Sequence, residues 1–415
     1  WHHGATRGRR HHQKHGTAVS NLSPDTDLPD RGHARAVLAA GCLGLFGFAV
    51  SAQMLPATLV PVAETFQLDL GRRGVLLGIS SIGFLSATLV GGVLGDRWGY
   101  RRNILAGLVL NVLGLAVATV ARSFAHMLLF RFLLGISGGL MVGPLSALVS
   151  DAYGSRRSVA LNIMTMFFNV GAVVGPFAVS LFLARGLTWR YGFGMAAGTV
   201  FLAFLVISQV LRRRRGDGEE QRASRPGPVP WSLVMILALC MLLYMGGEIT
   251  FSAWSSNYIE ETFGLTTDRA ARVLSGFWLG MVGGRLLCVW LVPRIGYLLP
   301  ILASTALCVA GGLVVALTGS AAVAFVGVCV MGFFMGGTWP NIVGYAGHRI
   351  QRRTGTVFAI LVAAGSVGTL IFPPLEGALS EALDYGLRTA MMTAVLAFGL
   401  LGLIALGIRL RLGPD

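Results

Sequence analysis

The chain has 415 residues, of which 54% are apolar and 12% are charged, and its formal net charge is +15. An ordinary soluble domain has about 25% charged residues, so this composition excludes a soluble enzyme with a polar shell. The 57 glycines suit membrane helices, which approach one another closely through small residues. We therefore expect an all-α membrane protein.

Residues 1–35 are polar, and twelve apolar segments follow them, each able to cross a bilayer. A membrane-spanning helix needs about 20 mostly apolar residues, and these segments lack the alternation of transmembrane strands. We expect a disordered cytoplasmic tail over 1–35 and then twelve transmembrane helices. The predicted spans are residues 37–60, 74–95, 103–121, 126–149, 159–184, 191–211, 231–256, 270–292, 298–318, 321–346, 356–382 and 389–409.

A polar segment at 212–230 divides these spans into two sets of six. It predicts two six-helix bundles, 36–211 and 231–415, joined by a cytoplasmic linker. A shift of 197 residues places Arg97 and Gly99 on Arg294 and Gly296, and Pro176 on Pro373. Parallel repeats of this kind are typical of one transporter architecture, in which the substrate binds between two pseudo-symmetric halves near the bilayer midplane.

The charges are distributed unevenly between the two sides of the predicted membrane. Most of the 33 Lys and Arg residues lie in the segments on the same side as the N-terminus. By the positive-inside rule, both termini of this multi-pass protein are expected to be cytoplasmic, in the inner (plasma) membrane. The net charge then reflects topology and attraction to anionic lipid rather than nucleic acid. All five cysteines lie in predicted spans without metal-site spacing, so we expect no metal.

The loop after the second predicted span reads GGVLGDRWGYRR, residues 91–102. It resembles the signature loop of the major facilitator superfamily (MFS), G-x-x-x-D-R-x-G-R-R/K. The resemblance implies a secondary transporter that works by alternating access, not an enzyme, and a gate in this loop. An aspartate at a membrane edge can lie at another helix's N-terminus and pair with arginines, which holds one face shut. The predicted gating residues are Gly92, Asp96, Arg97, Gly99, Arg101 and Asp151.

The C-terminal half indicates a branch of the family. The seventh span reads YMGGEITFSAWSSNY, residues 244–258, and Gly284-Arg285 follows in the eighth. Together these resemble the fucose and glucose symporters, which implies import of a small polar solute, a sugar, with protons. That branch carries acids in its first and fourth spans, whereas 37–60 and 126–149 contain none. The rivals are a drug/proton antiporter, because residues 171–176 resemble the G-x-x-x-G-P element, and a carboxylate transporter.

The predicted spans contain few ionisable residues, and the cost of placing such a residue in a membrane makes each one a functional candidate. Glu248 is expected in the outer half, to bind sugar hydroxyls or carry the proton, or else to be structural. Arg285 is expected about 20 Å from Glu248 by helix rise, which is too far for the two side chains to pair. It is expected to bind a substrate anion or to form part of an inner gate; alternatively, its side chain extends to the membrane surface. Arg131 couples transport or bonds carbonyls of neighbouring helices, and Glu376 lies near the outer end of its span.

Amides and aromatic rings at helical spacing complete the predicted pocket, since rings on sugar faces and amides on hydroxyls suit a polar solute. Trp254 and Tyr258 are also consistent with interfacial anchors, and Asn162 with a solvated amide. We expect a monomer with no cofactor besides the coupling ion, a proton. The predicted substrate-binding residues are Gln53, Asn162, Asn169, Tyr244, Glu248, Phe251, Trp254, Trp278, Arg285 and Asn341, and the predicted coupling residues are Glu248 and Arg131.

Overall fold

A computed structural model describes residues 1, 31–154, 157–212, 229–350, 354–383 and 386–413, and all regular structure in this part of the chain is helical. Most of the predicted tail and linker therefore lies outside the described residues. The helices are α1 (Arg31–Ala57), α2 (Leu59–Phe66), α3 (Leu70–Trp98), α4 (Tyr100–Thr119), α5 (Phe124–Tyr153), α6 (Arg157–Ala184), α7 (Arg190–Arg212), α8 (Trp231–Phe263), α9 (Thr267–Ile295), α10 (Leu298–Leu317), α11 (Ala321–Met335), α12 (Thr338–Arg349), α13 (Thr354–Ala382) and α14 (Arg388–Leu412).

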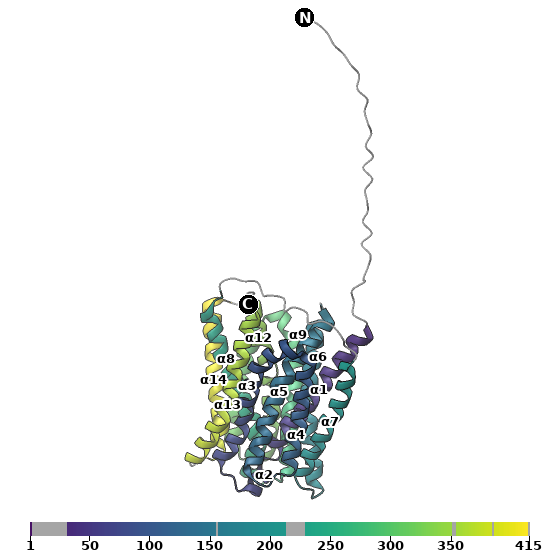
Figure 1. The fold of residues 1–415 in the computed structure, drawn as a ribbon. Coiled ribbons are helices and arrows are strands. Elements are labelled where there is room, and N and C mark those ends of the chain that lie inside the picture. The colour runs from purple at the N-terminus through teal and green to yellow at the C-terminus, as the bar shows by residue number, and fades with distance from the viewer. Residues whose placement is uncertain (2–30, 155–156, 213–228, 351–353, 384–385, 414–415) are drawn as a thin grey trace.

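The long helices run roughly parallel to one axis, so the molecule has two opposite faces (Figure 1). α1 begins and α14 ends on one face, which we call the termini face. The short α2 lies at the other, which we call the distal face. Eleven of the described segments are long and apolar enough to cross a membrane, with α11 and α12 counted as one. The 29-residue α3 brings the membrane-length segments of the described chain to twelve, as predicted.

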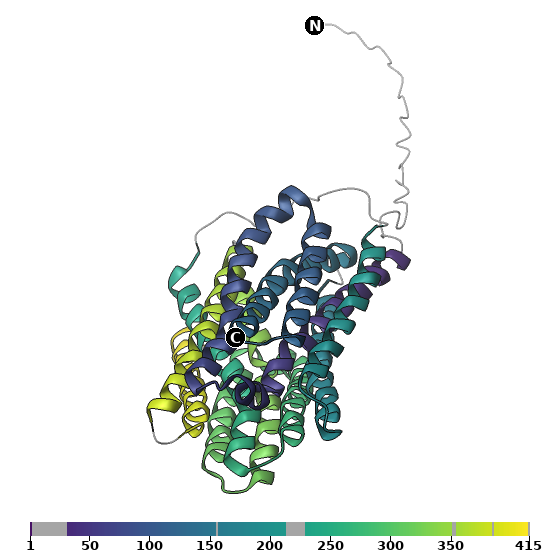
Figure 2. The same cartoon turned by 60° about the horizontal axis from the view of Figure 1, so that its bottom comes forward.

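The helices form two bundles, α1–α7 and α8–α14, which lie side by side (Figure 2). α3 packs against α13 and α6 against α9 across the junction. The approach of α3 and α13 requires glycine, because a Cβ atom on Gly74 would lie 2.4 Å from the Pro373 carbonyl oxygen. A Cβ atom on Gly377 would lie 2.3 Å from the carbonyl oxygen of Leu70. Small residues thus set the contact between the bundles, as membrane packing favours.

The internal repeat has a structural counterpart. Gly99 precedes α4 with a φ of +79°, and Gly296 follows α9 with a φ of +77°. Both values lie in the region that only glycine adopts readily. Pro176 lies inside α6, and Pro373 lies at the corresponding place inside α13. The two bundles are therefore pseudo-symmetric copies of one six-helix unit.

The tenth membrane segment is not one helix. α11 ends at Met335 and α12 begins at Thr338, where a single span over 321–346 was expected. Gly336 and Gly337 lie in the break against α9, and a Cβ atom on Gly336 would lie 2.3 Å from the Met281 carbonyl oxygen. Broken membrane helices of this kind are tolerated where neighbouring groups satisfy the freed backbone atoms.

Candidate functional site

Three side chains from α8 and α9 meet beside the break between α11 and α12. The buried Tyr244 hydroxyl donates a hydrogen bond to the Met335 carbonyl at 3.0 Å. Arg285 donates from Nε to the Gly336 carbonyl at 3.1 Å. The half-buried Glu248 carboxylate interacts with the Tyr244 hydroxyl and with the charge of Arg285. We call Tyr244, Glu248 and Arg285 the polar cluster, and it satisfies two carbonyls at the helix break.

The expected 20 Å separation of Glu248 and Arg285 is wrong. Glu248 follows Trp231, at the termini end of α8, by 17 residues, or about 25 Å along the axis. Arg285 precedes Ile295, at the termini end of α9, by ten residues, or about 15 Å. The axial offset is thus about 10 Å, a gap that two long side chains reduce. The depth of Glu248 is as expected, but Arg285 was counted from residue 270 on the distal side. Because α9 extends from Thr267 to Ile295, counting both residues from the termini face gives the smaller offset.

A series of aromatic ring contacts connects the two bundles. Phe48 of α1 and Phe168 of α6 have ring centroids 6.3 Å apart, and Phe168 meets Trp278 of α9 edge-on at 5.8 Å. Trp278 contacts Phe277 at 5.5 Å, and Phe277 contacts Phe251 of α8 at 6.2 Å. We call these five rings the aromatic bridge. Edge-on and tilted ring pairs at such distances are favourable contacts, so the bridge joins the halves through apolar surface.

Buried polar atoms without partners lie beside the aromatic bridge. Asn169 is 0% exposed, and neither its Oδ1 nor its Nδ2 has a hydrogen-bond partner among the described residues. The Nε1 atom of Trp278 is likewise buried and unpartnered there. An unmet buried donor or acceptor costs about 1–3 kcal/mol. These groups are suited to hydrogen-bonding a polar solute that enters between α6 and α9.

The other predicted pocket residues are placed less uniformly. Gln53 of α1 is buried, and Asn341 of α12 is buried with its Nδ2 atom 3.7 Å from the Cys288 sulfur. Asn162 is exposed near the termini end of α6, seven residues before Asn169. This placement agrees with a solvated amide, the alternative interpretation, and it separates Asn162 from the other candidates.

Trp254 and Tyr258 are not interfacial anchors. Both side chains are 0% exposed inside the C-terminal bundle. The Tyr258 hydroxyl donates to the Val315 carbonyl of α10 at 2.9 Å, while the Trp254 Nε1 atom has no partner among the described residues. The interpretation failed because α8 continues to Phe263, so these residues lie a turn or more inside the helix rather than at its end.

Arg131 bonds backbone carbonyls of neighbouring helices. It is 5% exposed, and its guanidinium donates to the carbonyls of Leu76 and Leu77 at 3.2 and 2.7 Å and to the Ser80 hydroxyl at 3.0 Å. A longer contact of 3.5 Å reaches the Ala52 carbonyl of α1. Arg131 therefore ties α5 to α3 and α1, which is the structural alternative stated above. Its predicted part in coupling stays a prediction.

The predicted gate loop lies between α3 and α4 at the termini face. Gly99 makes the turn with its positive φ, and Arg101 is exposed in the first turn of α4. Asp151 is exposed in the last turn of α5. The side chains of residues 91–98, which include Gly92, Asp96 and Arg97, lie outside the described part of the structure. The gating role of this loop stays a prediction.

Contacts near the distal face that sequence reasoning missed join the two bundles. Arg73 of α3 hydrogen-bonds the Glu261 carboxylate and donates to Asn257 Oδ1 at 3.3 Å, both on α8. The Ser256 hydroxyl donates to the Pro56 carbonyl at 2.8 Å. We call these five residues the distal latch. In the sequence, Arg72 and Arg73 were interpreted only as charges of a loop. The partners of Arg73 lie 184 and 188 residues away along the chain, so no local pattern indicates them.

A second contact extends this closure to α13. The amide of Gly71 donates to Glu381 Oε2 at 3.3 Å, close to the crossing of Gly74 and Pro373. Deeper along α3, the hydroxyls of Ser81 and Thr369 lie 2.8 Å apart. In the described part of the chain, the hydrogen bonds between the bundles belong to the distal half of the molecule. The bundles are thus held shut on that face.

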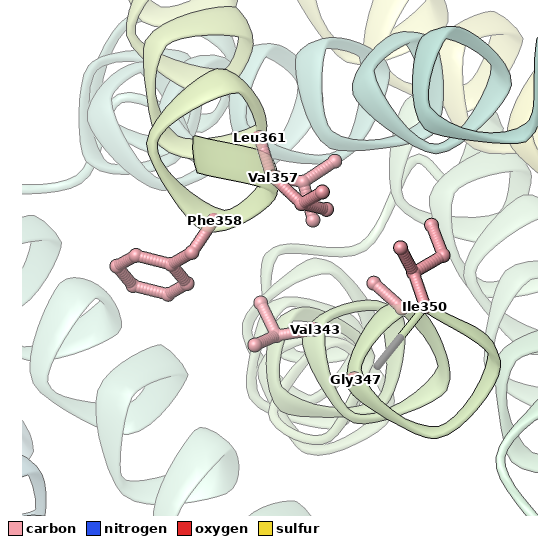
Figure 3. Close-up of a pocket in the computed structure, with 7 residues that line it drawn as sticks. Val343, Gly347, Ile350, Val357, Phe358 and Leu361 are labelled. Atoms are coloured by element: carbon pink, nitrogen blue, oxygen red, sulfur yellow. The ribbon is translucent and has the colours of Figure 1, made fainter. Parts of the chain in front are cut away.

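A cavity of about 150 Å³ lies elsewhere, between α12 and α13 toward the termini face (Figure 3). Its walls are side chains such as Val343, Ile350 and Phe358, with Gly347 between them, and all the lining residues are apolar. It contains none of the predicted substrate-binding residues. The convergence of polar groups that a solute site requires lies at the polar cluster and the aromatic bridge instead.

Known proteins similar to this chain include several named TsgA homologues. The homologue from Buchnera aphidicola is 15% identical over 364 residues, which cover 86% of this chain and 92% of the relative. The homologue from Erwinia tasmaniensis is 21% identical over 375 residues, or 88% and 94% of the two chains. An alignment with the homologue from Edwardsiella ictaluri, 22% identical, covers 58% of this chain and 63% of that relative.

Solved structures share the fold. A bacterial homologue of the human lysosomal transporter Spinster, inward-facing and occupied, has a TM-score of 0.72 and 17% identity over 91% of this chain and 97% of that chain. The MFS transporter FucP in its outward conformation has a TM-score of 0.60 and 18% identity over 89% and 98%. The profile of the Major Facilitator Superfamily matches residues 41–373 and 237–414. With twelve membrane-length segments in two pseudo-symmetric bundles, this chain belongs to the Major Facilitator Superfamily and is a secondary transporter.

Proposed function

We propose that this protein moves a small polar solute, a sugar, across the plasma membrane together with protons. The observation that carries the proposal is the pair of buried, unpartnered polar groups of Asn169 and Trp278 beside the aromatic bridge. An amide and an indole N–H can bind hydroxyl groups, while the rings cover the apolar face of a sugar. Both groups come from helices that pack across the bundle junction, where rocking of the halves would expose a solute to each side in turn.

The charge distribution supports cytoplasmic termini, which makes the distal face external. In this orientation the distal latch closes the external entrance, and the solute reaches its site from the cytoplasm. The loop with Asp96 and Arg97, together with Asp151, would close the cytoplasmic side in the opposite state. The latch and the gate loop then alternate, and the protein works as a monomer.

Glu248 is the proposed proton carrier. It is the acidic member of the polar cluster, and Tyr244 and Arg285 both act on it. A carboxylate that exchanges a proton changes its attraction to Arg285, and Arg285 in turn bonds the broken tenth segment through the Gly336 carbonyl. Protonation of Glu248 can therefore alter the contact between α9 and the tenth segment, which Arg285 makes at the Gly336 carbonyl.

Reconstitution tests the proposal directly. Purified protein in proteoliposomes should take up a labelled hexose under an imposed pH gradient. Trp278→Phe should reduce uptake, whereas the matched control Trp290→Phe, on the lipid-exposed side of the same helix (57% exposed), should not. Glu248→Gln should abolish the response to the gradient, with the exposed Glu64→Gln as control. If the protein neither takes up nor binds sugar and its fluorescence changes when drugs are added, the proposal of sugar transport is wrong and drug efflux takes its place.

A second candidate function is carboxylate transport, favoured by the placement of Arg285 in the polar cluster rather than on the lipid face. A guanidinium binds a carboxylate with charge-assisted hydrogen bonds. Binding of small carboxylates that is lost in Arg285→Ala and kept in Glu248→Gln would favour this candidate. Uptake of sugar that survives Arg285→Ala would exclude it.

A further inference from the structure

The distal ends of α13 and α14 enclose a carboxylate that the transport cycle proposed above does not use. Glu376 of α13 is 0% exposed, and neither carboxylate oxygen has a hydrogen-bond partner among the described residues. Ser380 lies one turn further along the same helix, on the same side, and its buried hydroxyl is unpartnered in the same sense. Two turns of α13 thus present three buried oxygen atoms without partners.

Thr393 of α14 contacts this stretch of α13, and Thr389 precedes it by one turn on the same helix. The Thr393 hydroxyl lies near the Glu376 carboxylate, but it donates its hydrogen bond to the Thr389 carbonyl at 3.0 Å. Thr389 is one turn nearer the distal end, and its Oγ1 atom is buried and unpartnered within the described chain. Because α13 runs toward the distal face and α14 runs back from it, the register set by Glu376 and Thr393 brings Thr389 to the axial level of Ser380. We call these four residues the α13–α14 oxygen site.

No cationic side chain of the described structure pairs with Glu376. The charged groups of the helices around it interact elsewhere: Arg72 with Asp69, Arg73 with Glu261, Glu248 with Arg285, Glu260 with Thr267, Glu381 with the Gly71 amide, and Arg388 with Tyr258. A buried carboxylate without a counter-charge is costly. A bound cation would remove that cost.

We propose that Glu376, Ser380, Thr389 and Thr393 bind a sodium ion. A proton would neutralise the carboxylate but would leave the Ser380 and Thr389 hydroxyl oxygens unpartnered. A sodium ion can be coordinated by the carboxylate and by both hydroxyl oxygens, because hard cations take carboxylate, hydroxyl and carbonyl oxygens as ligands. Transporters also hold sodium at oxygen sites between helices. Sodium binding at this site goes beyond the proposed sugar transport and does not depend on it.

The position of the site connects it to closure of the distal face. Gly377, next to Glu376, packs against the Leu70 carbonyl of α3, and Glu381, next to Ser380, accepts the Gly71 amide. An ion that holds α13 against α14 therefore orders the surface of α13 on which α3 closes. This effect on closure rests on the proposed alternating access, whereas ion binding itself is measured without any solute.

The test is thermal unfolding of the purified full chain in detergent, with NaCl compared with KCl and choline chloride at equal ionic strength. Sodium should raise the Tm of the wild-type protein in a saturable way, because a ligand of the folded state stabilises it. Glu376→Gln should abolish the sodium response without lowering the Tm in choline chloride, since it removes an uncompensated charge. Ser380→Ala should weaken the apparent sodium affinity about tenfold, the order expected when support for a bound ion is lost.

Controls separate ion binding from a general loss of structure. Glu248→Gln and Glu381→Gln, on and near the same helices, should keep the sodium response, and binding of radiolabelled sodium should follow the same order of variants. An equal Tm in sodium and choline for the wild-type protein would overturn the proposal. So would a sodium response that survives Glu376→Gln, or stabilisation by acid pH alone, which would mean a proton occupies the site.

Discussion

The distal latch makes a quantitative prediction for the variant Arg73→Ala. Arg73 is 14% exposed in its side chain and Glu261 is 37% exposed, so their ion pair contributes at most about 1 kcal/mol. The hydrogen bond to Asn257 adds more, because Asn257 is 1% exposed and a buried acceptor left without its donor costs about 1–3 kcal/mol. A total of about 2 kcal/mol corresponds to roughly a 30-fold shift of the equilibrium toward opening of the distal face.

Spin-label distance measurements across the distal face can detect this shift. Labels at Ala125, in the first turn of α5, and at Ser320, just before α11, lie on exposed sites of opposite bundles. In Arg73→Ala the population at longer distances should grow by about the factor above. The matched control is Arg72→Ala, because Arg72 is 60% exposed and, among the described residues, forms its ion pair with Asp69, next to the start of α3. An unchanged distance distribution in Arg73→Ala, or an equal change in Arg72→Ala, would refute the latch.

Three further variants test other parts of the structure. Gly74→Ala should lower the Tm or open the distal face, because its Cβ atom meets a carbonyl of α13 at 2.4 Å and overpacking costs about 1–3 kcal/mol; Gly143→Ala, with open space around it, should be neutral or slightly stabilising, and equal effects would contradict the close approach. Arg131→Lys should destabilise the N-terminal bundle by about 1–3 kcal/mol in thermal unfolding, since one ammonium cannot replace the bonds to α3; a wild-type Tm would exclude this tie. Tyr244→Phe should lower the free energy of unfolding by about 1 kcal/mol. It should alter the kinetics of uptake into proteoliposomes more than the expression level, and unchanged uptake would remove Tyr244 from the site.

The polar cluster illustrates the limit of depth counting. Helix rise alone placed Glu248 and Arg285 about 20 Å apart, although the identity of both residues as candidates followed from their cost inside a bilayer. Trp254 and Tyr258 were consistent with interfacial anchors because the predicted span ended at residue 256. They are buried instead, because α8 continues to Phe263. Where a helix ends depends on backbone hydrogen bonds that extend past the apolar core, and composition does not report them.

The twelve spans, their division into two sets and the repeat that aligns Gly99 with Gly296 followed from the sequence, because lipid requires long apolar helices and the pattern of apolar segments is a local property. The turns at these two glycines were seen only in the structure. The break at Gly336, the bonds of Arg131 to α3 and the distal latch emerged only in three dimensions. Each depends on which helices become neighbours, and residues as far apart as Arg73 and Glu261 meet only after both bundles have packed.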